Sequence, residues 1–135
     1  MRFALLILVL GLVGCASDDA RLRGTWRSNH EMTVAAAFQK NPTLTNLPPD
    51  RLERFKDLYG DLTMTYSNGI ATSLFHGKTE SWRYHVIQHG ADFVVIRSKI
   101  SGLSNSKIRF VDGGRGYWVD AGWQYQEYFD KISER

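Results

Sequence analysis

The sequence contains little cysteine, no long apolar run and no cluster of basic residues. Cys15 is the only cysteine among the 135 residues, which excludes disulfide bonds within the chain, so a folded domain must depend on its hydrophobic core. The longest apolar run, residues 3–13, is too short for a transmembrane helix, which needs about 20 residues. Basic side chains nowhere form a run longer than two residues, and the net charge is only +3. These features give no indication of nucleic-acid binding.

The first 14 residues have the organisation of a signal peptide: a positive charge at Arg2, the apolar run and a small residue at its end. The residues Leu12-Val13-Gly14-Cys15 that close this segment resemble the lipobox of bacterial lipoproteins, in which the cysteine receives lipid and becomes the mature N-terminus. The resemblance implies a diacylglycerol on Cys15 that anchors the chain on a membrane, because two or three acyl chains bind stably whereas one binds only marginally. The alternative is an ordinary signal peptide followed by a buried cysteine.

The position after the cysteine bears on the choice of membrane. In the lipoproteins that this segment resembles, an Asp directly after the cysteine tends to retain the protein in the inner membrane, and here that position is Ala16. The resemblance therefore implies a lipid-anchored protein of the bacterial cell envelope, on the outer membrane and facing the periplasm if the source has two membranes. We accordingly divide the chain into a signal peptide (1–14), the lipidated cysteine with its tether (15–20) and one folded domain (21–135).

The folded domain begins with a predicted strand and two predicted short helices. Residues 21–28 are typical of a strand, and residues 33–40 are typical of an alanine-rich helix, for which Thr33 is a plausible N-cap. A second helix is expected at residues 49–59, because its apolar residues recur at helical spacing and Gly60 follows as a C-terminal stop.

From residue 61 the apolar pattern has a period of two, which is typical of strands. Tight turns interrupt it, among them Asn68-Gly69, a strong hairpin signal. Short connections place successive strands side by side, and closing the sheet removes both exposed edges. We therefore predict a mostly β fold: a small antiparallel up-and-down meander that closes as an eight-stranded barrel, with two short helices between strands 1 and 2. The seven strands after the helices are expected at residues 62–66, 70–76, 79–88, 93–100, 107–111, 117–120 and 123–132.

Gly24-Thr25-Trp26 on the first strand, followed by helices and a meander, resembles the calycins, meaning lipocalins and fatty-acid-binding proteins. The resemblance implies a calycin-like barrel around a small apolar ligand, with Trp26 closing one end beneath a basic residue of the last strand in a cation–π contact. Lys131 is in the right part of the chain for that role. The basic and tyrosine side chains that clamp a ligand carboxylate in fatty-acid-binding proteins have no clear counterpart here.

Aromatic side chains are the strongest indication of a ligand site. An eight-stranded barrel is just wide enough to be filled by side chains or to hold one small ligand. Aromatic residues serve either purpose, so a filled core and a ligand cavity both remain open. Arg97, in an otherwise apolar strand, would orient a ligand carboxylate or phosphate if it pointed inward; the alternative is that it faces solvent. The candidate ligand-binding residues are Trp82, Tyr84, Arg97, Phe110, Tyr117 and Tyr125.

No group of residues indicates catalysis. His85 and His89 would lie roughly 13 Å apart on a strand, too far to share a metal ion, and the glycine-rich segment 113–116 lacks the Lys-Ser/Thr of a phosphate-binding loop. We expect no enzymatic activity, no cofactor and no metal site. The sequence favours a non-enzymatic binding module for a small apolar or amphipathic ligand. The alternative is a protein-interaction or enzyme-inhibitor lipoprotein that contacts an envelope partner through loop 101–107 around a packed barrel.

Overall fold

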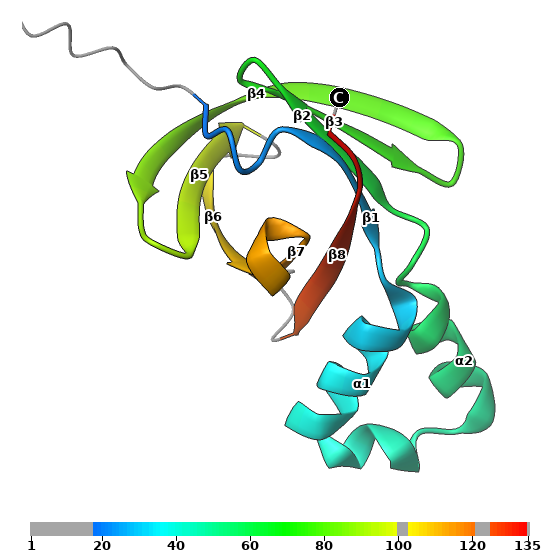
Figure 1. Ribbon diagram of the computed structural model, residues 1–135. Helices are drawn as coiled ribbons and strands as arrows, with labels where there is room; N and C mark the ends of the chain where they lie inside the picture. Colours follow the sequence, from blue (N-terminus) through cyan, green and yellow to red (C-terminus); the bar gives the residue numbers. More distant parts are fainter. Residues whose placement is uncertain (1–17, 100–102, 121–124, 135) are drawn as a thin grey trace, which may run out of the picture.

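The computed structural model describes residues 18–99, 103–120 and 125–134, which form a closed barrel of eight antiparallel strands (Figure 1). The strands follow one another around the barrel in sequence order, and the last strand closes it against the first. This architecture confirms the predicted mostly β, up-and-down barrel. The strands are β1 (Gly24–Ser28), β2 (Thr63–Ser67), β3 (Ile70–Phe75), β4 (Lys78–His89), β5 (Phe93–Lys99), β6 (Leu103–Val111), β7 (Gly116–Asp120) and β8 (Gln126–Ser133).

Two helices lie between β1 and β2, as predicted, and occupy the space at one end of the barrel (Figure 1). They are α1 (His30–Lys40) and α2 (Pro49–Asp57), which the short 3-10 helix η1 (Pro42–Asn46) connects. Only α1 packs extensively against a strand, namely β8. The helices therefore cover one part of this end of the barrel and leave another part accessible.

The N-cap of α1 differs from the predicted one. The helix begins three residues before Thr33, because Asn29 Oδ1 accepts the backbone N–H of Met32 at 2.9 Å. The prediction of Thr33 as the cap is wrong. Thr33 is fully buried inside the helix, and its hydroxyl accepts the backbone N–H of Tyr128 at 3.0 Å. That hydrogen bond joins α1 to β8.

Most strands lie within a few residues of their predicted positions. The Asn68–Gly69 turn joins β2 to β3, and its two residues have the positive φ angles, 51° and 74°, that this tight hairpin turn requires. β6 begins at Leu103 rather than at residue 107, because residues 103–105 pair with β5. Part of the predicted 101–107 loop is thus sheet. Residues 100–102 and 121–124 lie outside the described residues.

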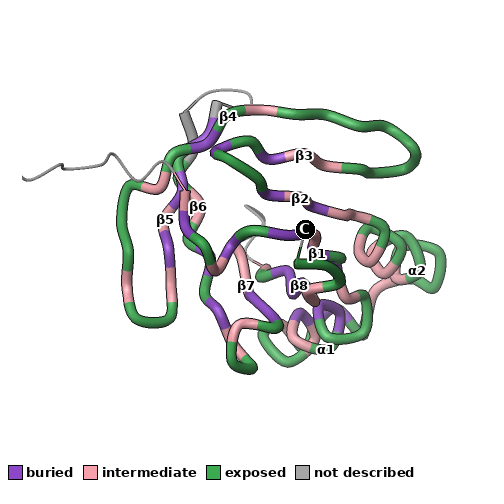
Figure 2. Tube along the Cα trace, turned by 45° about the horizontal axis from the view of Figure 1, so that its top comes forward, coloured by how far each residue is buried: buried purple, intermediate pink, exposed green. Residues whose placement is uncertain are grey.

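The alternation along β4 shows which face of the sheet points into the barrel. Tyr84 is fully buried, and Trp82 and Val86 pack against the core, whereas Arg83 and His85 between them are exposed. Figure 2 shows that burial alternates along the strands, while the far tip of the β3–β4 hairpin is exposed. The buried core consists of Leu22, Trp26, Met64, Tyr66, Ala71, Tyr84, Val94, Ile96, Ile108, Phe110, Tyr117 and Phe129.

Trp26 is fully buried at one end of the barrel, hereafter the closed end. Lys131 of β8 places its Nζ atom 5.1 Å from the centre of the Trp26 ring, so the predicted cation–π contact is confirmed. Gly24 makes this arrangement possible. A Cβ at that position would lie 2.2 Å from the carbonyl oxygen of Ser133 and 3.1 Å from Lys131 Cε, and its φ of 115° is one that glycine tolerates. The Gly24 and Trp26 of the motif therefore have structural roles.

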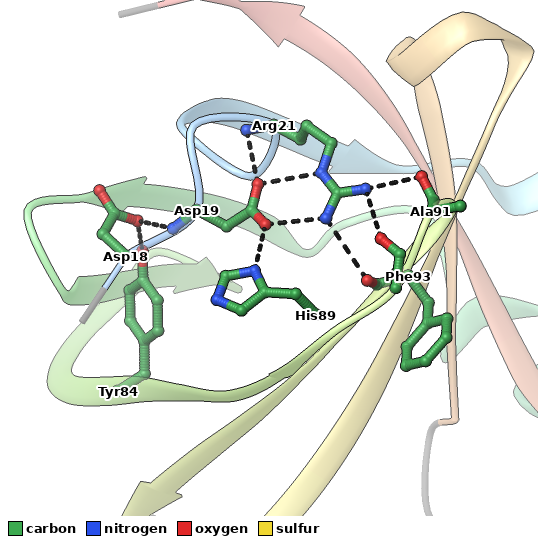
Figure 3. Close-up of polar contacts among 8 residues, drawn as sticks. Asp18, Asp19, Arg21, Tyr84, His89, Ala91 and Phe93 are labelled. Atoms are coloured by element: carbon green, nitrogen blue, oxygen red, sulfur yellow. Dashed lines mark hydrogen bonds and ion pairs between the residues drawn. The ribbon is translucent and has the colours of Figure 1, made fainter. Parts of the chain in front are cut away.

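Hydrogen bonds and ion pairs attach the residues before β1 to this closed end (Figure 3). Both oxygens of the Asp19 carboxylate accept hydrogen bonds from the Arg21 guanidinium, at 3.1 and 2.8 Å, and His89 Nδ1 lies 3.0 Å from Asp19 Oδ2. Arg21 also donates to the carbonyl oxygens of Gly90 and Ala91 in the β4–β5 turn, at 3.0 and 2.8 Å. The hydrogen bonds from Arg21, reinforced by His89, lower the pKa of Asp19 to about 2.

Asp18 makes a second attachment on the neighbouring side. Its Oδ1 accepts the Tyr84 hydroxyl at 2.5 Å (Figure 3), and its Oδ2 accepts Arg23 Nε at 2.8 Å. Burial opposes ionisation of Asp18, but these hydrogen bonds outweigh it and lower its pKa. Two adjacent carboxylates thus bind the start of the described chain to β4 and to the β4–β5 turn.

Candidate functional site

The barrel is hollow at the end opposite Trp26. An outer cavity of about 490 Å³ opens there, and an inner cavity of about 140 Å³ lies deeper between the strands. Leu62, Met64, Trp82 and Glu127 line both cavities, so the two adjoin. The outer volume falls within the range of roughly 300–1,000 Å³ that small-ligand sites have. The outer cavity is also lined by Leu58, Ser73, Phe75, Lys78 and Glu80, and the inner one by Tyr66, Ile96, Ser98, Ser106, Ile108, Tyr117, Val119 and Phe129.

Glu127 is the buried acidic group where the two cavities meet. Its Oε1 atom accepts the hydroxyl of Ser28 at 2.5 Å, and Ser28 Oγ in turn accepts the backbone N–H of Gly60 at 3.0 Å. A serine hydroxyl has one proton, so this arrangement directs that proton at Glu127. Burial raises the pKa of Glu127, and the Ser28 hydrogen bond opposes the shift. The two hydrogen bonds that link Gly60 of the α2–β2 connection, Ser28 of β1 and Glu127 therefore fix the orientation of the carboxyl group.

Two tyrosine hydroxyls share the interior with this carboxyl group. Tyr66 of β2 and Tyr117 of β7 are both buried, and both line the inner cavity. Burial raises the pKa of Tyr66 to about 12 and raises that of Tyr117 well above its usual value, with the negative charge of Glu127 acting in the same direction. Both hydroxyls thus stay protonated at physiological pH and supply neutral hydrogen-bonding groups.

Charge is unevenly distributed around the cavities. Among the described residues, no Lys, Arg or His nitrogen forms an ion pair with Glu127. Lys78 and Glu80 lie two residues apart on β4 at the rim of the outer cavity, and both are exposed. The deep part of the site is therefore acidic, and the rim carries one charge of each sign.

Comparison of the chain with protein-family models, with curated proteins and with solved structures finds no match. Any functional assignment must therefore come from the geometry of the site.

Four of the six predicted ligand-binding residues lie inside the barrel, but only two of them line the cavities. Trp82 borders both cavities and Tyr117 the inner one. Tyr84 and Phe110 are buried in the closed half: Tyr84 reaches Asp18, and the Phe110 ring lies beneath the Arg21 guanidinium, 5.0 Å from its centre.

The other two predicted residues lie outside the barrel interior. Arg97 is exposed on the outer face of β5, where its Nε donates to Asn105 Oδ1 at 3.1 Å. It cannot orient a ligand in the cavity, because its neighbours Ile96 and Ser98 occupy the inward positions. Tyr125 precedes β8 and packs edge-on against Phe55 of α2, bordering a separate hollow of about 250 Å³ beside α1.

Sequence reasoning missed Glu127, the most distinctive residue of the site. A signal for it exists, because Glu127 has the same parity as the buried Phe129 on β8, so an acidic residue occupies an inward position. Ser28, its partner, is 99 residues away in the sequence, so no local pattern links the two.

In residues 18–99, 103–120 and 125–134, no three His, Cys, Asp or Glu side chains are grouped so that they could hold a metal ion. None of the helices in this part of the chain has the length and hydropathy needed to cross a bilayer.

Proposed function

We propose that this chain is a lipid-anchored envelope protein whose barrel binds a small amphipathic molecule in the cavity opposite Trp26. The observation that carries the proposal is the cavity itself: it has the volume of a small-ligand site. Apolar side chains form most of its wall, and a few oriented polar groups lie at its inner end. This is the usual composition of a binding pocket, in which apolar area supplies affinity and the polar groups supply specificity.

In this proposal the lipid is attached to Cys15. The attachment of Asp18 and Asp19 to the barrel supports one orientation of the barrel relative to the membrane. Two residues separate Cys15 from Asp18, so their Cα atoms lie at most about 10 Å apart. Asp18 and Asp19 are bound to the closed end of the barrel. On this proposal the closed end faces the membrane surface, and the cavity opens away from it toward the aqueous compartment. The ligand then enters from solution rather than directly from the bilayer.

Native mass spectrometry of the protein extracted gently from its own membranes tests both parts of the proposal. The denatured mass should equal the chain from Cys15 onward plus diacylglycerol and acyl groups. The native spectrum should contain an additional small mass that is lost on activation, which identifies the ligand class. A denatured mass without lipid would overturn the anchor, independently of the cavity.

A pair of leucine variants ties the bound molecule to the cavity. Leu62 lines both cavities, so Leu62→Trp should fill the space and abolish the additional mass. Leu74 is exposed on β3 and borders neither cavity, so Leu74→Trp should retain it. A bare lipoprotein mass in the wild type, or equal retention by both variants, would overturn the cavity function. The first of these outcomes would favour a barrel that acts on an envelope partner through its surface.

A further inference from the structure

We propose that the ligand is an amphipathic amine, with its ammonium group bound to Glu127 and its apolar body directed toward the mouth along Leu62 and Trp82. This inference rests on the proposed function and specifies the chemistry of the molecule that the cavity takes.

The first argument is the position of Glu127. The residue lines the outer and the inner cavity, so a head group entering from the mouth meets it at the inner end of the larger space. One oxygen is oriented by Ser28, whose hydroxyl is itself held by Gly60. Among the described residues, the second oxygen of Glu127 makes no hydrogen bond. It is therefore an acceptor that a ligand donor can use.

The second argument is charge. A buried carboxylate without a cationic partner is unfavourable, and no basic side chain in the described part of the chain is paired with Glu127. A ligand ammonium would supply the missing counter-charge and form a charge-assisted hydrogen bond. A ligand carboxylate or phosphate would instead meet the like charge of Glu127, which lines both cavities. The site thus selects against anions.

The third argument is the wall between Glu127 and the mouth. Leu62, Met64 and Trp82 line it continuously, and Leu58 and Phe75 extend it to the rim, where both side chains are exposed. An aliphatic or aromatic body lying there would bury apolar surface on both the protein and the ligand. Trp82 lines the same two cavities as Glu127, and an aromatic ring face attracts a cation within about 6 Å. Charged side chains on this path are confined to the rim, at Lys78 and Glu80.

Three probes with one twelve-carbon chain and different head groups test the inference: dodecylamine, dodecanol and dodecanoate. Binding of each probe is measured as displacement of N-phenyl-1-naphthylamine, an apolar fluorescent dye, from the protein. Each probe is used below its own critical micelle concentration. A chain starting at residue 15 with serine in place of Cys15 is suitable, because the closed barrel and its core lie within residues 18–134. Dodecylamine should bind at least about tenfold more tightly than dodecanoate, the effect expected of one hydrogen bond to a charged group.

Two variants in which a glutamate is replaced by glutamine test whether Glu127 causes the preference for the amine. Glu127→Gln should weaken dodecylamine about tenfold, leave dodecanol within about twofold and strengthen dodecanoate. Glu80→Gln removes the exposed carboxylate of β4 at the rim and should change each affinity much less. Circular dichroism of both variants confirms that the barrel is retained.

The outcomes separate this inference from the proposed function. If the dye and all three probes fail to bind, the cavity function is overturned. If the three probes bind equally, or Glu127→Gln leaves the amine unaffected, the cavity function stands and the amine preference is overturned. If dodecanol equals dodecylamine and both weaken in Glu127→Gln, the head group is a neutral donor, and the ammonium proposal is again overturned.

Discussion

The Nζ atom of Lys131 lies 5.1 Å from the centre of the Trp26 ring, and this contact closes one end of the barrel. The side chain of Lys131 is largely buried, and at its tip it forms an ion pair of 2.9 Å with Glu134, which is mostly exposed. At the opposite end the described residues form no comparable plug, and the cavity that Glu127 lines opens there. One end of the barrel thus serves stability, and the other is available for binding.

The cation over Trp26 should contribute measurably to stability. Lys131→Met keeps an unbranched apolar side chain above the ring and removes the charge, so the free energy of unfolding should fall by about 1 kcal/mol. Urea denaturation followed by circular dichroism measures the change. Glu134→Gln is the matched control, since it breaks only the exposed ion pair, which contributes little. An equal loss in both variants would assign the effect to the ion pair rather than to the ring.

Glu127 should make the protein less stable at neutral pH than it would be with a neutral residue. Burial raises the pKa of Glu127 in the folded state. The stability that protonated Glu127 contributes is therefore present below the pKa of this residue in the unfolded chain, and it is lost as pH rises through the folded pKa. Glu127→Gln should therefore raise the melting temperature at pH 7 and should lose this advantage near pH 4. Thermal melts of both proteins across this range, with Glu80→Gln as the exposed control, measure it. A melting temperature at pH 7 equal to or below that of the wild type would contradict the prediction.

The attachment of the N-terminal residues should be sensitive to acid. The pKa of Asp19 is lowered to about 2, so the stability it contributes is fully present above about pH 4, the pKa of an unperturbed Asp. That stability is lost as pH falls toward 2. Asp19→Asn should cost about 2 kcal/mol at pH 7, and the difference from the wild type should narrow between pH 4 and pH 2. Asp57→Asn, at the exposed end of α2, is the control for the loss of a carboxylate elsewhere on the surface. A constant difference at all pH values would mean that the Asp19 charge does not act in this way.

The start of α1 should depend on Asn29. Asn29→Ala removes the acceptor for the Met32 N–H and the donor to Asp130 Oδ2, which lies 2.7 Å away. The loss of an N-cap costs about 1 kcal/mol, which corresponds to a fall of about 4 °C in melting temperature for a domain of this size. Asn29→Ser retains a capping oxygen and should fall between the two proteins. If Asn29→Ala melts like the wild type, Asn29 does not act as the cap.

The fold could be predicted because its signals are local. The alternation of apolar residues after residue 61 and the Asn68–Gly69 turn are properties of short segments, and both reappear in the structure. The predictions of the helix cap and of the strand ends were less accurate. Thr33 and Asn29 are both polar residues near the start of α1, and the choice between them depends on Tyr128, which a distant strand brings against Thr33.

The candidate site was only partly predictable, because it depends on which strands meet across the barrel. Trp82 and Tyr117 were identified from their residue type and alternation, and both line the cavities. Arg97 was assigned to the site although its neighbours on β5 occupy the inward positions, and β5 contains apolar residues of both parities, so alternation alone did not settle its direction. Glu127 was overlooked because its role depends on the cavity and on its hydrogen-bonding partners. These partners, Ser28 and Gly60, are both far from Glu127 in the sequence.

The sequence by itself determined the class of fold and the number of strands, because side-chain period and turn chemistry specify them locally; the contact of Lys131 with Trp26 was expected from the resemblance to calycins. Only the tertiary structure decided that one half of the barrel is packed and the other hollow, and that a single carboxyl group lies where the two cavities meet. Cavity volume and burial depend on side chains that strand register brings together from across the chain, and a shift of one residue in that register would turn each of them to the opposite face.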